Sequence, residues 1–175
     1  MTYRHRPDQD ASLIIVGSGF AAAAAVIHLA HNGFAPSNIL IIGPGTLGAG
    51  QAYGCKADAF RLNVRADLQR LWPDHSDHFP QWAKTHIEDP QAKTHAGLFY
   101  RRADFARYVN AQLEAATGKK ELRQVPARVV DIRPVQQGWQ VFCDNGADYC
   151  SARLLLAIGN PEPQWPIQNL SLIHI

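Results

Sequence analysis

The sequence contains no long apolar run and no apolar stretch at its N-terminus. A helix that crosses a membrane needs about 20 mostly apolar residues, and no run in this chain of 175 residues approaches that length. The opening segment, MTYRHRPDQDAS, also lacks the apolar region of a secretory signal peptide. We therefore expect a cytoplasmic protein with no membrane partner.

Cysteine and clustered charge are scarce as well. The three cysteines, Cys55, Cys143 and Cys150, form no C-x-x-C pair, so neither a disulfide framework nor a dithiol redox centre is supported. The 17 basic and 15 acidic residues nearly balance, and the net charge is +2 without a clustered basic face. We expect buried cysteines and a small-molecule substrate, with no nucleic-acid partner. The oligomeric state stays open.

Metal-binding patterns are also missing. Several histidines and aspartates do lie close together in the sequence. They are Asp74, His75, Asp77, His78, His86 and His95. Their spacing matches neither a helical H-x-x-x-H pair nor a standard zinc pattern, so we predict no metal site.

What the sequence does contain is a strand, glycine turn, helix and strand in succession. Residues 13–16 read LIIV, a continuous aliphatic run typical of a parallel strand covered on both faces. The segment GSGFAA that follows matches G-x-G-x-x-[GA]. Residues 20–32 are rich in alanine and predict a helix that ends before Gly33, and residues 38–42 predict the second strand of a βαβ unit.

This glycine pattern is typical of a turn that binds a dinucleotide. Gly17 would permit the tight turn, Gly19 would let backbone N–H groups approach a pyrophosphate, and Ala22 would let the helix pack closely. The phosphates would then lie at the N-terminus of the helix. The cofactor-binding candidates in the turn are Gly17, Ser18, Gly19, Phe20, Ala21 and Ala22. An ordinary glycine turn without a ligand is the alternative.

One part of the usual pattern is absent. An acidic residue about 20 positions after the glycines normally binds the ribose hydroxyls, but no Asp or Glu lies between Asp10 and Asp58. Gly43 occupies the expected place, and no nearby Arg favours a ribose phosphate. We expect Thr46 or backbone groups to hold the ribose.

Further segments follow in a recognisable order. They are GQAYG at 50–54, LNV at 62–64, an aromatic stretch from Trp72 to Trp82, and FYRR at 99–102 before a helix that contains Tyr108. Together with the glycine turn, this order resembles the FAD/NAD(P)-binding family that includes FAD-dependent urate hydroxylase and aspartate N-monooxygenase. The resemblance spans residues 13–163, although Gln51 stands where a basic residue is more common.

The resemblance implies FAD as a tightly bound cofactor, NAD(P)H as reductant without a choice between NADH and NADPH, and oxygenation of a small molecule. Arg101, and also Arg102, could place a guanidinium near the pyrophosphate or flavin. Alternatively, both are solvated residues at the start of an amphipathic helix. Trp72, Phe79 and Trp82 could wall a pocket, but their near-helical spacing favours the core for Phe79 and Trp82.

The second half predicts a β-meander that returns to the main sheet. Residues 127–132, 139–143 and 152–158 read as strands, and the intervening QQG and DNG segments read as turns. Val129 in the first of these strands is a further cofactor-binding candidate. The last strand runs into Ala157, Ile158 and Gly159, which resemble the A-T-G segment that closes the FAD domain of two-dinucleotide flavoproteins. A plain strand terminator is the alternative.

The predicted fold is α/β, a Rossmann-like FAD/NAD(P)-binding domain with a central parallel sheet and a β-meander. We expect a disordered arm at 1–12, the domain at 13–166 and a tail at 167–175, whose SLIHI end resembles a translated sequencing adapter. Neither a second glycine motif nor an acidic segment for the ribityl chain follows Gly159, so we expect the domain to be incomplete.

The predicted function is the FAD-binding portion of an NAD(P)H-using flavin monooxygenase, inactive when this portion stands alone. No side chain is an obvious acid, base or nucleophile, so no catalytic residue is predicted. One alternative is an NAD(P)-dependent dehydrogenase without flavin. Another is a non-catalytic dinucleotide-binding module.

Overall fold

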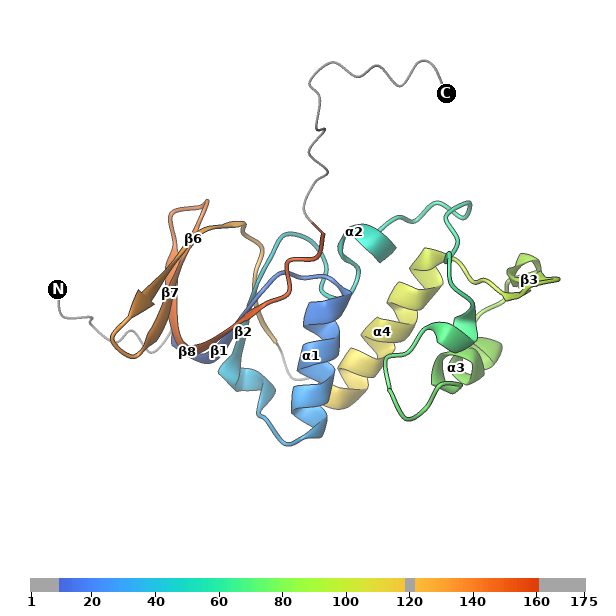
Figure 1. Cartoon of the computed structure of the whole chain (residues 1–175), viewed down its shortest axis with the longest axis horizontal. Coiled ribbons are helices and arrows are strands. Elements are labelled where there is room, and N and C mark those ends of the chain that lie inside the picture. Colours follow the sequence, from blue (N-terminus) through green and yellow to red (C-terminus); the bar gives the residue numbers. More distant parts are fainter. Residues whose placement is uncertain (1–9, 119–121, 161–175) are drawn as a thin grey trace, which may run out of the picture.

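The computed structural model describes residues 10–118 and 122–160. In this part of the chain, the central sheet has six strands in the order β5-β2-β1-β8-β7-β6 (Figure 1). The strands are β1 (Asp10–Val16), β2 (Ile39–Ile42), β5 (Arg123–Val125), β6 (Val129–Val135), β7 (Gly138–Cys143) and β8 (Asp148–Leu156). β1 runs parallel to β2 and to β8, and β2 runs parallel to β5. β6, β7 and β8 are antiparallel neighbours. The predicted α/β fold with a parallel sheet and a meander is confirmed.

The helices form a layer that extends away from one face of the sheet (Figure 1). α1 (Phe20–His31) lies next to the sheet, α4 (Arg102–Thr117) packs beside α1, and α3 (His78–His86) packs on α4. The short elements between them are η1 (Pro36–Asn38), α2 (Gly50–Tyr53), η2 (Ala66–Leu68), η3 (Pro90–Ala92), β3 (Lys93–Thr94) and β4 (Gly97–Leu98). None of the helices described is long and apolar enough to cross a membrane.

β1 and β2 are buried on both faces, which explains their continuous apolar sequences. Successive side chains of a strand point to opposite faces, and each face here has its own cluster. On the helix side the strand residues are Leu13, Ile15, Ile39 and Ile41, packed with Val26 and Phe105 among others. On the other side they are Ile14, Val16, Leu40 and Ile42, covered by Val141 and Cys143 of the meander.

α1 packs closely on the sheet because its inner face is made of small residues. Ala22 and Ala23 are fully buried there, followed by Val26 and Ile27 one turn later. The helix ends at His31, and Gly33 has a φ of 84°, a left-handed conformation in which glycine has no steric cost. The predicted helix and its glycine stop are confirmed.

Three predicted boundaries differ from the structure. β1 begins at Asp10 rather than 13, because Ala11 pairs with Ser151 of β8, so residues 10–12 belong to the sheet and not to an N-terminal arm. β6 runs on to Val135, and β8 begins at Asp148 and ends at Leu156, which leaves Ile158 beyond the strand. Residues 1–9 and the predicted tail at 167–175 lie outside the described residues.

Candidate functional site

Three loops meet at the carboxyl edge of the parallel strands. Gly17 follows β1, Gly43 follows β2 and Ala157 follows β8, and these three strands are neighbours with β1 in the middle. The N–H of Gly17 donates to the carbonyl of Ile42 at 2.7 Å, and the N–H of Ala157 donates to Val16 at 2.8 Å. The chain crosses to one side of β1 for β2 and to the other side for β8. Open α/β sheets bind their ligands at such a switch point.

Gly17 makes the tight turn that the sequence predicts. Its φ is 113°, a conformation that residues with a side chain rarely adopt. A Cβ atom at this position would lie 2.2 Å from the carbonyl oxygen of Ala157. Glycine is therefore required both by the backbone conformation and by the close approach of the loop after β8.

The N-terminus of α1 presents neutral donors without a competing acid. Gly19 is the N-cap residue, its position has no side-chain cap, and the first turn contains no acidic residue. The first backbone bond back to the cap runs from Ala23 to Gly19 at 3.1 Å, so the N–H groups of Phe20 and Ala21 precede the intrahelical bonds. These donors and the helix dipole favour a negatively charged group.

The surroundings of Gly19 leave room for a ligand. A Cβ atom there would have only the Cα of Gly50 within 4 Å, at 3.9 Å. Ala21 beside it is exposed, whereas Ala22 is fully buried against the sheet. Ala22 thus serves the predicted close packing of the helix, and the open side of the turn is formed by Gly19 and Ala21.

The loop after β2 lies directly against the glycine turn. A Cβ atom at Gly43 would be 2.7 Å from the nitrogen of Ser18, and one at Gly50 would be 2.8 Å from the Cα of Gly19. The N–H of Gly48 donates to the carbonyl of Ser18 at 2.9 Å, and the buried Ser18 hydroxyl donates to the carbonyl of Pro44. The two loops therefore form one structural unit. Apart from the missing acid at residue 43, no sequence pattern indicates this contact.

The remaining candidates at this edge are placed in different ways. Thr46 is exposed on the loop after β2. Ala157 is 9% exposed and lies over Gly17, whereas Ile158 is 66% exposed and Gly159 has a φ of 69°. An exposed isoleucine beside the turn can offer an apolar contact. Val129 is half-buried in the core cluster on the face opposite α1.

A family assignment agrees with the geometry at the carboxyl edge of the sheet. A model of the family described as FAD-NAD(P)-binding matches residues 14–161 of the chain. The chain belongs to this FAD-NAD(P)-binding family. The predicted family and cofactor class are confirmed at that level. No curated protein matches the chain.

Solved structures share the fold of this FAD-NAD(P)-binding domain. OTEMO in complex with FAD and NADP has a TM-score of 0.59 at 20% identity and covers 95% of this chain and 29% of its own. Closed cyclohexanone monooxygenase has a TM-score of 0.60 at 14% identity, covering 86% and 26%. Bacillithiol disulfide reductase Bdr from Staphylococcus aureus has a TM-score of 0.57 at 16% identity, covering 86% and 39%. The chain thus spans 26% to 39% of the length of these structures.

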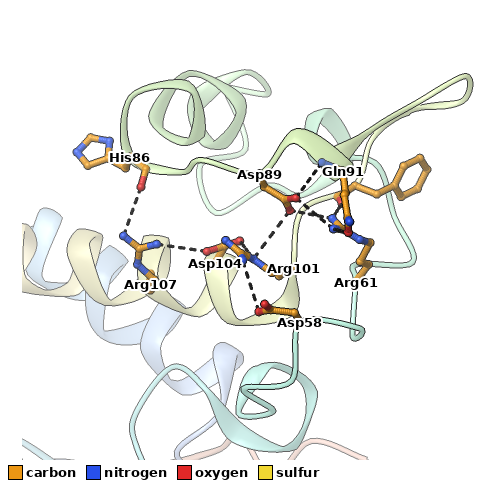
Figure 2. A network of polar contacts seen from close by, with 9 residues as sticks. Asp58, Arg61, His86, Asp89, Gln91, Arg101, Asp104 and Arg107 are labelled. Atoms are coloured by element: carbon orange, nitrogen blue, oxygen red, sulfur yellow. Dashed lines mark hydrogen bonds and ion pairs between the residues drawn. The ribbon is translucent and has the colours of Figure 1, made fainter.

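The donors of Arg101, the predicted anion-binding arginine, go to carboxylates of the domain itself (Figure 2). Its Nε donates to Asp104 at 2.7 Å, and its Nη1 donates to Asp58 at 3.4 Å. The carboxylate of Asp89 lies 3.9 Å from Nε. The hydrogen bond to Asp104 raises the pKa of Arg101 above its ordinary value. These contacts give Arg101 a structural role, and its assignment as a cofactor contact stays a prediction.

The same network joins the segment just before the β3–β4 hairpin to α4 (Figure 2). Arg61 makes two bonds to the carboxylate of Asp89, at 2.8 and 3.1 Å, and holds the pKa of that carboxyl below its usual value. Arg107 donates to Asp104 at 3.3 Å and to the carbonyl of His86 at 3.3 Å. The side chains of Asp89 and Asp104 are each 4% exposed. Such buried carboxylates need partners.

Arg102 differs from its neighbour in its partners. Its Nε donates to the carbonyl of Arg61 at 3.1 Å, and its Nη1 donates to the carbonyl of Ala52 in α2 at 3.4 Å. In the segments described, no ion pair joins it to a carboxylate. The sequence does not distinguish the two adjacent arginines, but their hydrogen-bond partners in the structure differ.

The aromatic segment packs into the helical layer. Phe79 is 1% exposed, as predicted, and Trp82 is half-buried against the same cluster. Trp72 is also half-buried, with the ring of His28 5.0 Å away. Fully buried Tyr108 shares a hydrogen bond of 2.8 Å with Nδ1 of His78, and burial raises the pKa of its phenol.

The histidine and cysteine side chains are also candidates as metal ligands or reactive groups. Within the described ranges no group of three or more His, Cys, Asp or Glu could hold a metal ion. Cys143 and Cys150 are buried, as expected, and Cys55 is only half-buried.

Proposed function

We propose that the chain is the FAD-binding portion of a flavin-dependent oxidoreductase, a monooxygenase that uses NAD(P)H to oxygenate a small molecule. The observation that carries this proposal is the turn from Gly17 to Ala21, where three loops meet and the first turn of α1 contains no acidic residue. The family assignment supports FAD or NAD(P) as the ligand.

The residues of the turn would divide the work of holding FAD. The N–H groups of Gly19, Phe20 and Ala21 would bind the pyrophosphate, and Ser18 would fix the loop after β2 against the turn. Thr46 and the backbone of that loop would face the ribose. When bound, FAD supplies the redox chemistry, and these residues bind and orient it.

The apolar end of β8 would serve the cofactor from the other side. Ile158 is largely exposed directly after Ala157, and Gly159 leaves space beside it. Val129 would contact the cofactor from the face of the sheet opposite α1. The order of motifs favours an enzyme of the urate hydroxylase or aspartate N-monooxygenase type within the family. We assign no catalytic residue to this chain.

FAD binding to the purified chain tests the proposal. The chain is mixed with FAD, separated from free FAD, and examined by its visible absorption spectrum, and the released cofactor is identified after denaturation. We expect bound oxidised flavin in a 1:1 ratio. If the chain binds NAD(P)H but no FAD, the dehydrogenase alternative replaces this proposal, and if it binds neither, both fail.

Gly19→Val distinguishes a dinucleotide turn from a simple bend. Gly19 has a φ of −79° and free space around its Cβ position, so the fold should tolerate valine while the side chain blocks the approach of a pyrophosphate. We expect loss of FAD binding with an unchanged melting temperature. The matched control is Gly33→Asn at the other end of α1, where nothing lies within 4 Å and asparagine tolerates the left-handed conformation. Unchanged FAD affinity in Gly19→Val would contradict the assignment.

A further inference from the structure

Within residues 10–118 and 122–160, Arg102 forms no ion pair with a carboxylate. Most arginines near it form ion pairs with aspartates. They are Arg61, Arg65, Arg101 and Arg107. Half-buried Arg102 is held only by the carbonyls of Arg61 and Ala52 among its hydrogen-bond partners in the described chain. A half-buried cation favours an anionic partner.

The position of Arg102 connects it to the glycine turn through α2. Its guanidinium contacts the carbonyl of Ala52, and the neighbouring Gly50 lies against Gly19. Tyr53 of the same short helix has its ring 6.0 Å from the ring of Phe20, the first residue of α1. Figure 1 shows α2 at the end of the molecule where α1 and α4 begin. One short helix therefore separates Arg102 from the turn.

The turn and the loops around it contain no charge of their own. Neither Lys nor Arg occurs from residue 11 to residue 55. The N–H groups of Gly19 and α1 are neutral donors, whereas a dinucleotide brings a diphosphate with two negative charges. A cation supplied from another element would complete the site, because charge-assisted hydrogen bonds are stronger than neutral ones.

We infer that Arg102 binds the diphosphate of the cofactor and that Arg101 instead holds the fold. This inference rests on the proposed function, and it names the residue that recognises the charged part of the ligand. Arg102 stays next to α2 through its bonds to Ala52 and Arg61, which keep the guanidinium at the end of the molecule where the turn lies. The ligand class is a dinucleotide or ADP-containing nucleotide.

The test compares FAD and adenosine binding in Arg102→Gln and Arg102→Lys. We expect Arg102→Gln to weaken FAD binding about tenfold or more and to reduce the salt dependence of that binding. Arg102→Lys should restore part of the affinity, because lysine keeps the charge without the planar fork. Adenosine, which has no phosphate, should bind the wild type and Arg102→Gln equally. Exposed Arg70→Gln, the matched loss of one charge, should leave FAD affinity within about twofold.

The outcomes separate this inference from the proposed function. If the wild type binds FAD and Arg102→Gln binds it equally well, only the role of Arg102 is overturned. If Arg102→Gln loses FAD and adenosine alike, or its melting temperature collapses, the residue is structural and the inference fails. If the wild type binds no FAD at all, the proposed function fails and this inference falls with it.

Discussion

The backbone of Gly43 lies so close to Ser18 that a Cβ atom at residue 43 would be 2.7 Å from the Ser18 nitrogen. Gly43 stands where a ribose-binding carboxylate is usual in this kind of turn. The missing acid is thus explained by a steric contact between two loops. The loop after β2 lies against the glycine turn, and a side chain at its first residue would separate them.

We expect Gly43→Asp to weaken FAD binding about tenfold or more, although it restores the usual residue type, because the two loops must move apart. The measurement is FAD affinity by fluorescence quenching. The control is Gly45→Asp in the same loop, with a φ of 85° and nothing within 4 Å of its Cβ position, which should change the affinity little. Higher affinity in Gly43→Asp than in the wild type would refute the steric account.

Gly17→Ala should destabilise the fold as well as the site. The substitution adds a Cβ atom 2.2 Å from the carbonyl of Ala157 at a φ of 113°, and we expect a loss of about 3 kcal/mol or more in the free energy of unfolding. Gly118→Ala, with a φ of 63° and open space, should cost about 1 kcal/mol. Chemical denaturation measures both variants, and equal losses would contradict the proposed contact.

Asp89→Asn should lower stability by about 2 kcal/mol at neutral pH, because it weakens the paired hydrogen bonds from Arg61 to a buried carboxylate. Arg61 depresses the pKa of Asp89 in the folded state. The ion pair therefore stabilises the fold above the unfolded-state pKa of about 3.9, and its contribution is lost as the pH falls through the folded-state pKa.

Acid unfolding measures this difference. Below about pH 4, the stability of the wild type should fall more steeply than that of Asp89→Asn, and the two curves should converge. The matched control is Asp67→Asn, which removes an exposed ion pair with Arg65 and should leave the stability unchanged. Parallel curves for the wild type and Asp89→Asn would show that the pair does not set the acid limit.

Tyr108→Phe should cost about 1 kcal/mol, because it removes one buried hydrogen bond, to His78, and keeps the ring in place. Tyr108→Ala should cost about 3–5 kcal/mol, since the ring packs 5.1 Å from Phe79 and 5.4 Å from Trp82. Urea denaturation separates the two contributions. If Phe costs as much as Ala, the hydroxyl and not the packing dominates at this position.

Most of the sheet was predictable because its patterns are local, but the short edge strand β5 was not predicted. The run at 13–16 and the turn at Gly17 indicate a buried parallel strand that enters a helix, and the DNG segment indicates the second turn of the meander. The extent of β8 was not predictable, because its first half, from Asp148 to Ser151, mixes polar and apolar residues. Strand pairing with β1 and β7 imposes the extended conformation there.

The residues of the candidate site could be predicted only in part, because some of their contacts depend on the fold and not on local sequence. Arg101 and Arg102 are adjacent and chemically identical, so nothing local distinguishes them. Their partners differ because folding brings Asp58 to the first and Ala52 to the second, in each case from a distant part of the sequence. The contact between Gly43 and Ser18 likewise joins two loops that no sequence period connects.

The contact between the Ala157 carbonyl and Gly17 can form only late in the synthesis of the chain. Nearly the whole chain separates these two residues, so the glycine turn leaves the ribosome long before the loop that closes over it. At roughly 5–20 residues per second, the nascent N-terminal half waits on the order of ten seconds for β8. The turn at Gly17 therefore gains its contact with Ala157 only after β8 has been synthesised, and a nascent chain without β8 lacks that side of the turn.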